Sequence, residues 1–116
     1  MKTYEAVGVV ETLYFTVAIE MLDEMLKSSN VEFLRKETTL GGKLITLFVG
    51  GSVSEVSNAI ELVKKLGEGK HINHLKNAIV ISKPHPEILK YVISSEKIIN
   101  EETLKVNNQF TVSERR

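Results

Sequence analysis

The stretch "ETTLGGKLITLFVGG", residues 37–51, holds four of the chain's seven glycines, in pairs at the two ends of an apolar run. Residues 31–39 partly alternate apolar and polar side chains, which is typical of a strand with one wet face. Residues 43–51 are apolar almost throughout, which favours a central strand covered on both faces. Only Leu40, Gly41 and Gly42 separate the two segments, so the sequence predicts an antiparallel hairpin.

The second glycine pair leads into a helix. The letters "SVSE" at 52–55 have the form of a capping box. In this motif the Ser52 side chain accepts from the Glu55 amide, and the Glu55 carboxylate reaches back to the Ser52 amide. Apolar residues then recur with helical spacing until Gly67 or Gly69 ends the helix. The expected buried stripe is Val53, Val56, Ile60, Val63 and Leu66.

Two further strands and one helix are expected around this segment. Residues 5–13 are rich in Val, as a buried strand is, and residues 75–82 form another strand that two prolines terminate. Residues 16–30 are amphipathic, with Thr16 as a candidate cap, and Ser28, Ser29 and Asn30 suit the helix end. Pro86 fits the first position of a short C-terminal helix. The apolar face expected on residues 16–30 is Ala18, Met21, Leu22, Met25 and Leu26.

The predicted order, β-α-β-β-α-β, describes a ferredoxin-like α+β domain over residues 1–93. One sheet would carry both helices on one face, with the short C-terminal helix added. The second face then needs a cover, or it faces a cavity. Residues 94–116 are polar with scattered apolar side chains, and we expect them to form a C-terminal extension, either a flexible tail or an added arm.

Composition excludes several classes of protein. A chain of 116 residues suits one domain, and 42 % hydrophobic with 26 % charged residues is ordinary for a globular protein. Fifteen acidic residues balance fifteen basic ones, so there is no general attraction to nucleic acid or to a membrane surface. No cysteine is present, which excludes disulfides, thiolate catalysis and cysteine-ligated metal centres. The N-terminal residues lack the pattern of a leader peptide and no run has the length of a membrane span, so we expect a cytosolic protein.

No pattern in the sequence points to catalysis. His71 and His74 have a spacing that brings two imidazoles together on a helix, but Gly67, Gly69 and Asn73 disfavour a helix there. We therefore interpret them as two loop histidines and expect no metal site. The stretch "VGGSVSE" joins a strand to a helix and could bind an anion weakly, although it lacks the spacing and lysine of a phosphate loop. A turn into a capped helix is the better interpretation, and we expect no cofactor.

Several stretches together carry a family resemblance. "EAVGVVET" with "VAIEMLDEMLKSSNVE", then "GGKLITLFVGGSVSEVSNAIE", then "IVISKPHPEIL" follow one another in unbroken order over about residues 5–93. The chain resembles a bacterial microcompartment (BMC) shell protein of the single-domain, hexamer-forming kind. Each stretch alone is a weak signal, and their order makes the resemblance specific.

The resemblance implies a structural protein and no enzyme. It implies a homohexamer that tiles with other shell proteins into the wall of a cytoplasmic organelle, beside encapsulated enzymes. The turn between the second and third strands would line a pore for small metabolites, and the edges between hexamers would be formed by residues near the helix end and the Pro-His turn. The implied pore residues are Leu40, Gly41, Gly42 and Lys43, and the implied edge residues are Lys27, Asn30, Lys83 and His85.

The chain departs from the family pattern at three places. Lys43 replaces the small residue or glycine that usually ends the pore turn, and the hairpin is one residue longer than usual. A ring of six Lys43 ammonium groups would favour anions, whereas side chains pointing to solvent would leave the pore uncharged.

Lys83 stands where many relatives have arginine, which turns a planar bidentate group into a point charge. The divergent extension is similar to the branch from glycyl-radical enzyme compartments, but the pore cysteine of that branch is absent.

Two other functions share the predicted fold. A regulatory module could bind a small ligand between subunits, with the glycine pairs as anion sites. The lysine in "EMLKSSN" and the turn in "SKPH" have no role in such a module and therefore favour the shell protein. An acylphosphatase-like enzyme needs an arginine in an N-terminal phosphate loop, but the first arginine here is Arg35.

Overall fold

The computed structural model describes residues 3–92. Residue contacts divide the chain into one compact unit, Met1–Pro84, and a second that begins at His85. The described part of the second unit is helical over residues 86–92, as the position of Pro86 predicts. The first unit contains the strands β1 (Ala6–Leu13), β2 (Glu32–Thr39), β3 (Leu44–Gly51) and β4 (Leu75–Ser82), the helices α1 (Phe15–Ser28) and α2 (Val53–Glu68), and the 3-10 turn η1 (Leu40–Gly42).

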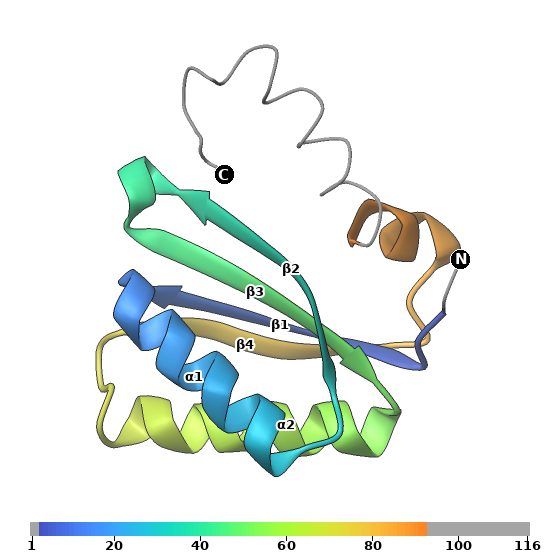
Figure 1. The fold of residues 1–116 in the computed structure, drawn as a ribbon, viewed down its shortest axis with the longest axis horizontal. Coiled ribbons are helices and arrows are strands. Elements are labelled where there is room, and N and C mark those ends of the chain that lie inside the picture. The colour runs from blue at the N-terminus through green and yellow to red at the C-terminus, as the bar shows by residue number, and fades with distance from the viewer. Residues whose placement is uncertain (1–2, 93–116) are drawn as a thin grey trace. The chain divides into compact units, whose positions relative to one another are not determined.

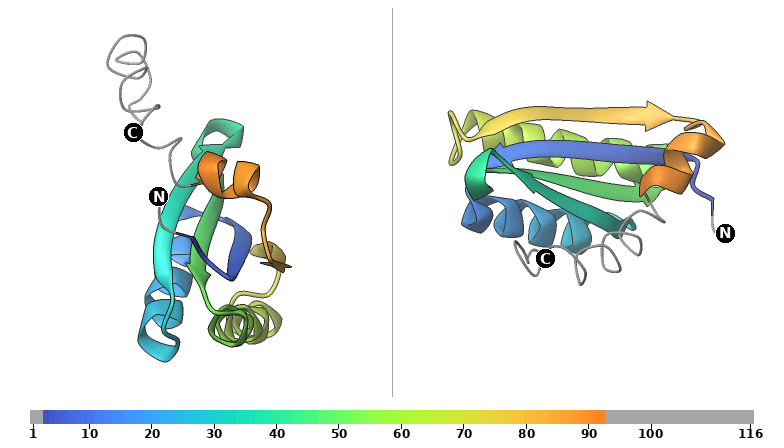
Figure 2. Two further views of the ribbon diagram at one scale, coloured as in Figure 1. Left: turned by 90° about the vertical axis from the view of Figure 1, so that its right-hand side faces the viewer. Right: turned by 90° about the horizontal axis from the view of Figure 1, so that it is seen from above.

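The four strands form one antiparallel sheet in the order β2-β3-β1-β4. Both helices lie along the same face of this sheet (Figures 1 and 2). The ferredoxin-like α+β prediction is therefore confirmed. β3 occupies an interior position, and its residues from Ile45 to Gly50 are all buried, as its apolar sequence predicts.

The core lies between the sheet and the two helices. α1 contributes Ala18, Met21 and Met25, while α2 contributes Val56, Ala59, Ile60 and Val63 from successive turns. Gly8 lets α2 approach β1, because a Cβ there would lie 3.1 Å from side-chain atoms of Ile60, Val49 and Val56. The predicted apolar faces are largely confirmed, with two exceptions. Leu26 is 45 % exposed and Val53 is 40 % exposed.

The pairing of β2 with β3 contains a β-bulge. Phe33 pairs with Val49 and Arg35 pairs with Phe48, so Leu34 is an extra residue in β2. A bulge places one more residue on one strand than on its partner. β2 therefore carries one residue more than β3 over this pairing. The expectation that the hairpin is one residue longer than in the family stays a prediction.

The start of α1 differs from the prediction. The helix begins at Phe15 after Tyr14, which has φ 71° and makes no side-chain capping bond. Thr16 therefore lies inside the helix and does not cap it. The predicted end is correct, since Ser29 is the C-cap and its amide donates to the Met25 carbonyl over 3.0 Å.

Only half of the expected capping box forms at the start of α2. Ser52 Oγ accepts from the Glu55 amide over 3.2 Å, as predicted. The Glu55 carboxylate instead accepts from the backbone amide of Asn30 over 2.8 Å. The Glu5 carboxylate accepts from the backbone amide of Val53 over 3.2 Å. The prediction of a reciprocal Glu55–Ser52 bond is wrong, because the carboxylate reaches the end of α1 in the folded chain. Gly69 is the C-cap.

Alternation along the strands places a second set of side chains on the face away from α1 and α2. By register, Val7, Phe48 and Ile81 lie on this face. Arg35 lies there as well and is only 3 % exposed, and its guanidinium contacts the Glu37 carboxylate at 2.7 and 3.0 Å. The expectation that something covers this face stays a prediction.

Candidate functional site

The β2–β3 turn has an unusual backbone. Leu40, Gly41 and Gly42 all have positive φ, at 54°, 65° and 92°. Glycine adopts this region freely, whereas a leucine there is strained. A Cβ at Gly41 or Gly42 would meet no atom within 4 Å, so the glycines serve the backbone conformation and not a packing contact within this chain. Leu40 is 67 % exposed, which places an apolar side chain at the tip of the sheet.

The base of this turn is fixed. The Lys43 amide donates to the Leu40 carbonyl over 3.2 Å, and the Lys43 carbonyl accepts from the Tyr14 amide over 2.9 Å. Lys43 itself is helical in φ/ψ and exposed, and β3 begins one residue later than predicted. The four predicted pore residues therefore form one exposed turn beside the β1–α1 junction, which Figure 1 shows at the same end of the sheet.

Lys27 and Asn30 lie at the C-terminal end of α1. The Lys27 ammonium is 2.9 Å from Asp23, one helical turn earlier, and both side chains are exposed. The hydrogen bond to Asp23, followed by the charges of Asp23 and Glu24, raises the pKa of Lys27. The Asn30 amide is held by Glu55, which fixes the chain where it enters β2.

Lys83 and His85 flank the boundary between the two compact units. Lys83 is exposed with φ 50°, and its amide donates to the Glu5 carbonyl over 2.8 Å. His85 precedes the helix of residues 86–92, and its Nδ1 accepts from the Glu87 amide over 3.1 Å. His85 thus caps its own helix, a role that its sequence context did not predict.

The predicted pore and edge residues of the first unit lie at opposite ends of the sheet. The turn follows the pairing of Thr39 with Leu44, whereas Lys83 follows Ser82, which pairs with Ala6 at the other end. Strands of eight residues, at about 3.3 Å each, separate the two ends by roughly 26 Å.

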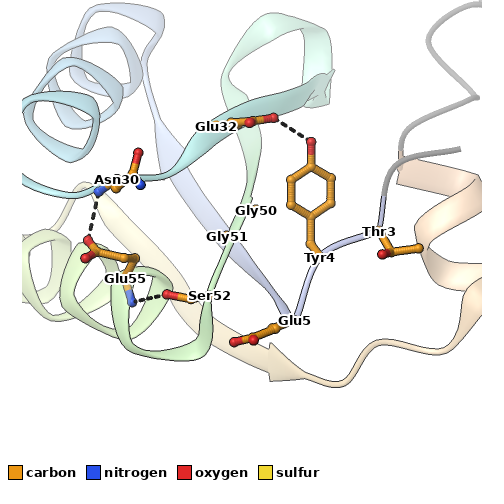
Figure 3. A pocket seen from close by; sticks show the side chains of 9 residues that line it. All are labelled: Thr3, Tyr4, Glu5, Asn30, Glu32, Gly50, Gly51, Ser52 and Glu55. Atoms are coloured by element: carbon orange, nitrogen blue, oxygen red, sulfur yellow. Dashed lines mark hydrogen bonds between the residues drawn. The ribbon is translucent and has the colours of Figure 1, made fainter.

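A pocket of about 320 Å³ lies at the end opposite the turn. Figure 3 shows its lining side chains and the hydrogen bonds that hold Glu32 and Glu55 in place. No sequence pattern predicts this pocket, because its residues come from separate segments with no common motif. They are Thr3, Tyr4, Glu5, Asn30, Glu32, Gly50, Gly51, Ser52 and Glu55.

Tyr4 forms one wall of this pocket. Its hydroxyl donates to the Glu32 carboxylate over 2.6 Å, and its ring lies over Gly50, where a Cβ would be 2.9 Å from the ring carbons. Burial and then the bond to Glu32 raise the pKa of Tyr4 to about 12. The phenol is therefore neutral at physiological pH and acts as a hydrogen-bond donor.

The two histidines in the α2–β4 connection come together. Residues 69–74 form turns and not a helix, as the glycines and Asn73 predicted. Even so, the Nδ1 atoms of His71 and His74 are 3.5 Å apart. His71 is buried, and its Nε2 lies 3.2 Å from Glu20 Oε1. The Tyr14 ring meets His74 edge-on with centroids 5.3 Å apart.

Comparison with known proteins identifies the family. The family model described as "BMC domain" matches residues 6–84, more than half of the chain. The chain belongs to the BMC domain family. The resemblance seen in the sequence is thereby confirmed, while the likeness to the glycyl-radical branch has no further support.

Curated relatives of this BMC-domain chain cover most of its length. The bacterial microcompartment shell protein PduA of Citrobacter freundii is 36 % identical over 86 residues, which are 74 % of this chain and 89 % of that protein. The carboxysome shell protein CcmK2 of Synechococcus elongatus is 35 % identical over 92 residues, 76 % of this chain and 84 % of that protein.

A solved microcompartment protein from Desulfitobacterium hafniense has the same fold. The TM-score is 0.65 at 21 % identity, and the match covers 78 % of this chain. This chain spans about half of that longer structure, 47 % of its length. Within residues 3–92, no helix is long and apolar enough to cross a bilayer.

Proposed function

We propose that this BMC-domain chain is a structural shell protein that forms cyclic homohexamers and tiles into the wall of a bacterial microcompartment. The observation that carries the proposal is the family match over residues 6–84, together with relatives that are shell proteins over nearly their whole length. The protein acts by assembly and carries out no reaction. Its partners are copies of itself and other shell proteins of the same compartment, with encapsulated enzymes behind the wall.

The turn Leu40–Lys43 is the proposed pore lining. Support comes from its exposure, its fixed base and the two glycines, which keep the backbone open to passing solutes. Six copies would bring six Lys43 side chains near one axis. At an assumed separation of about 10 Å in water, neighbouring ammonium groups repel by only about 0.4 kcal/mol, so the ring is tolerable and would favour anions.

Lys27, Asn30, Lys83 and His85 are the proposed edge between hexamers. The opposite placement of Lys83 and the turn supports this, because a pore at the centre of a ring requires the edge to lie outside. The aliphatic part of the Lys27 side chain can lie against a neighbouring hexamer while its ammonium group donates to carbonyl groups there. Lys27 can give up its exposed ion pair with Asp23 for that contact, because surface ion pairs contribute little stability.

Apolar side chains on the outside of α1 support the assembly of copies. Phe15, Ile19 and Leu26 are 52 %, 43 % and 45 % exposed and recur at intervals of four and seven residues, which places them along one side of the helix. A row of this kind is typical of a surface that another chain covers. Contacts between the six copies of a ring would bury it.

The test is native mass spectrometry combined with a crystal or electron-microscopy structure of the full chain. The expected result is a species of six chains with the Leu40–Lys43 turns around the six-fold axis. A monomer or dimer at all concentrations would overturn the hexamer. A ring whose turns lie on its outer rim would overturn the pore while leaving the hexamer intact.

A further inference from the structure

We infer that His71 and His74 form a binding site for a divalent transition-metal ion, with both Nδ1 atoms as ligands. The two nitrogens are 3.5 Å apart and the ring centroids are 5.6 Å apart, so the rings meet through their nitrogen edges and do not stack. Zinc–imidazole bonds are about 2.0–2.1 Å long. An ion at that distance from both atoms would form an Nδ1–metal–Nδ1 angle of about 115°, close to the tetrahedral value.

The turn that carries the two histidines is held by its own backbone. The His74 amide donates to the His71 carbonyl over 3.0 Å, and the His71 amide donates to the Leu66 carbonyl over 2.9 Å. The His74 carbonyl in turn accepts from the Leu13 amide over 2.9 Å and from the Thr12 hydroxyl over 3.1 Å. The site therefore exists before an ion arrives, which reduces the ordering cost of binding.

A carboxylate stands behind one of the two ligands. His71 Nε2 is buried 3.2 Å from Glu20 Oε1, yet none of the described residues gives it a well-aligned hydrogen bond. Metal-bound histidines typically donate their second N–H to a carboxylate, which orients the ring and raises its basicity. An ion on Nδ1 would leave the proton on Nε2, where a small rotation aligns it with Glu20.

Lys70 holds Glu20 in position for this role. Lys70 Nζ is 2.7 Å from Glu20 Oε2. The other carboxylate oxygen, Oε1, is the one that lies 3.2 Å from His71 Nε2. The arrangement Lys70–Glu20–His71 is thus the outer support that a two-histidine site needs.

Water can fill the remaining coordination positions. His74 is half-buried and Asn73 is exposed, so water can reach the side of the pair away from the core. Among residues 3–92 there is no group of three or more His, Asp or Glu side chains that could hold an ion. We therefore assign two protein ligands with water completing the shell, and imidazole ligands favour Zn²⁺, Cu²⁺ or Ni²⁺.

Zn²⁺ titration of the full chain tests this assignment. The protein must carry no histidine tag and must first be treated with a chelator. We expect one Zn²⁺ per chain, at least about tenfold weaker binding in Glu20→Gln, and a larger loss in His74→Gln and in His71→Gln. His85→Gln removes the third histidine of the chain and should bind like the wild type.

A second measurement locates the ion independently of affinity. A zinc-soaked crystal should show an anomalous peak about 2.0–2.1 Å from both Nδ1 atoms. His74→Gln keeps this test valid if the buried His71→Gln variant does not fold, because His74 is half-exposed. Equal loss of binding in His85→Gln and His74→Gln, or wild-type binding no tighter than that of the double variant His71→Gln/His74→Gln, would overturn the site.

Discussion

The backbone amide of Tyr14 donates to the carbonyl of Lys43 over 2.9 Å, which ties the β1–α1 junction to the β2–β3 turn. The ring of the same tyrosine lies edge-on against His74. One residue with φ 71° therefore joins the proposed pore turn to the histidine pair. The base of the turn is held by the domain, while Leu40 at its tip is exposed.

Gly41 should be replaceable by asparagine more easily than by alanine. Its φ of 65° disfavours any residue with a Cβ, although asparagine tolerates this region better, and no neighbouring atom opposes a side chain. We expect Gly41→Ala to reduce the free energy of unfolding by about 1–2 kcal/mol and Gly41→Asn by less. Urea denaturation measures both. An equal or larger loss for asparagine would mean that size, not backbone conformation, selects the glycine.

Lys27→Ala should leave hexamers intact and prevent them from forming sheets. The Lys27 side chain is 67 % exposed and pairs only with Asp23 on its own helix among the ion pairs of the described residues, so its loss should not disturb folding. Negative-stain electron microscopy and native mass measure the two outcomes separately. Lys64→Ala, an exposed lysine on α2, is the matched control. Ordered sheets of Lys27→Ala at wild-type concentration would refute the edge role.

The Ser52 side chain should stabilise the start of α2 as an N-cap. Ser52→Ala removes the acceptor for the Glu55 amide and should cost about 1 kcal/mol of stability. Ser57→Ala lies within the same helix and should be neutral or slightly stabilising. Thermal unfolding of both variants checks the difference, and equal melting temperatures would show that the Ser52 cap contributes nothing.

Glu55→Ala should loosen the end of α1 and not only the start of α2. The substitution removes the acceptor for the backbone amide of Asn30. We expect the free energy of unfolding to fall by about 0.5–1.5 kcal/mol, near the lower limit because the bond is exposed. Amide hydrogen exchange should increase at residue 30. Unchanged exchange there, with faster exchange at the Ser52 amide, would instead support the reciprocal capping box.

Tyr4 should make the protein less stable at high pH. Its pKa of about 12 in the folded protein lies above the ordinary tyrosine value of 10.0, so the folded state holds the proton more tightly than the unfolded chain. The resulting stability is fully present below pH 10 and is lost as pH rises from 10 to 12. Tyr4→Phe should abolish this loss and cost about 0.5–1.5 kcal/mol at neutral pH.

Glu32→Gln separates the two causes of this pH dependence. It keeps an acceptor for the Tyr4 hydroxyl but removes the negative charge. Burial is the larger cause of the raised pKa, so part of the dependence between pH 10 and 12 should remain. Denaturant unfolding at fixed pH values measures the profile, and an identical slope in wild type and Tyr4→Phe would exclude the assignment.

Local patterns predicted the elements well because secondary structure depends on residues close in the chain. The apolar run of 43–51 indicated an interior strand, and Ser52 and Gly69 marked the ends of α2 correctly. Thr16 failed as a cap because the chain turns at Tyr14, whose backbone is bonded to Lys43 from another part of the molecule. Val53 fits the helical period but lies at the exposed first turn.

Order and spacing of apolar, glycine and capping residues determined the ferredoxin-like fold and the BMC family of this chain. The tertiary structure decided which distant groups meet: Glu55 with Asn30, Tyr4 with Glu32, and Glu20 with His71 across 51 positions of sequence. It also brought His71 and His74 together in a turn, although their spacing favours contact only on a helix. These contacts depend on how the helices pack on the sheet. A periodic sequence pattern does not show which polar atoms this packing brings close to one another.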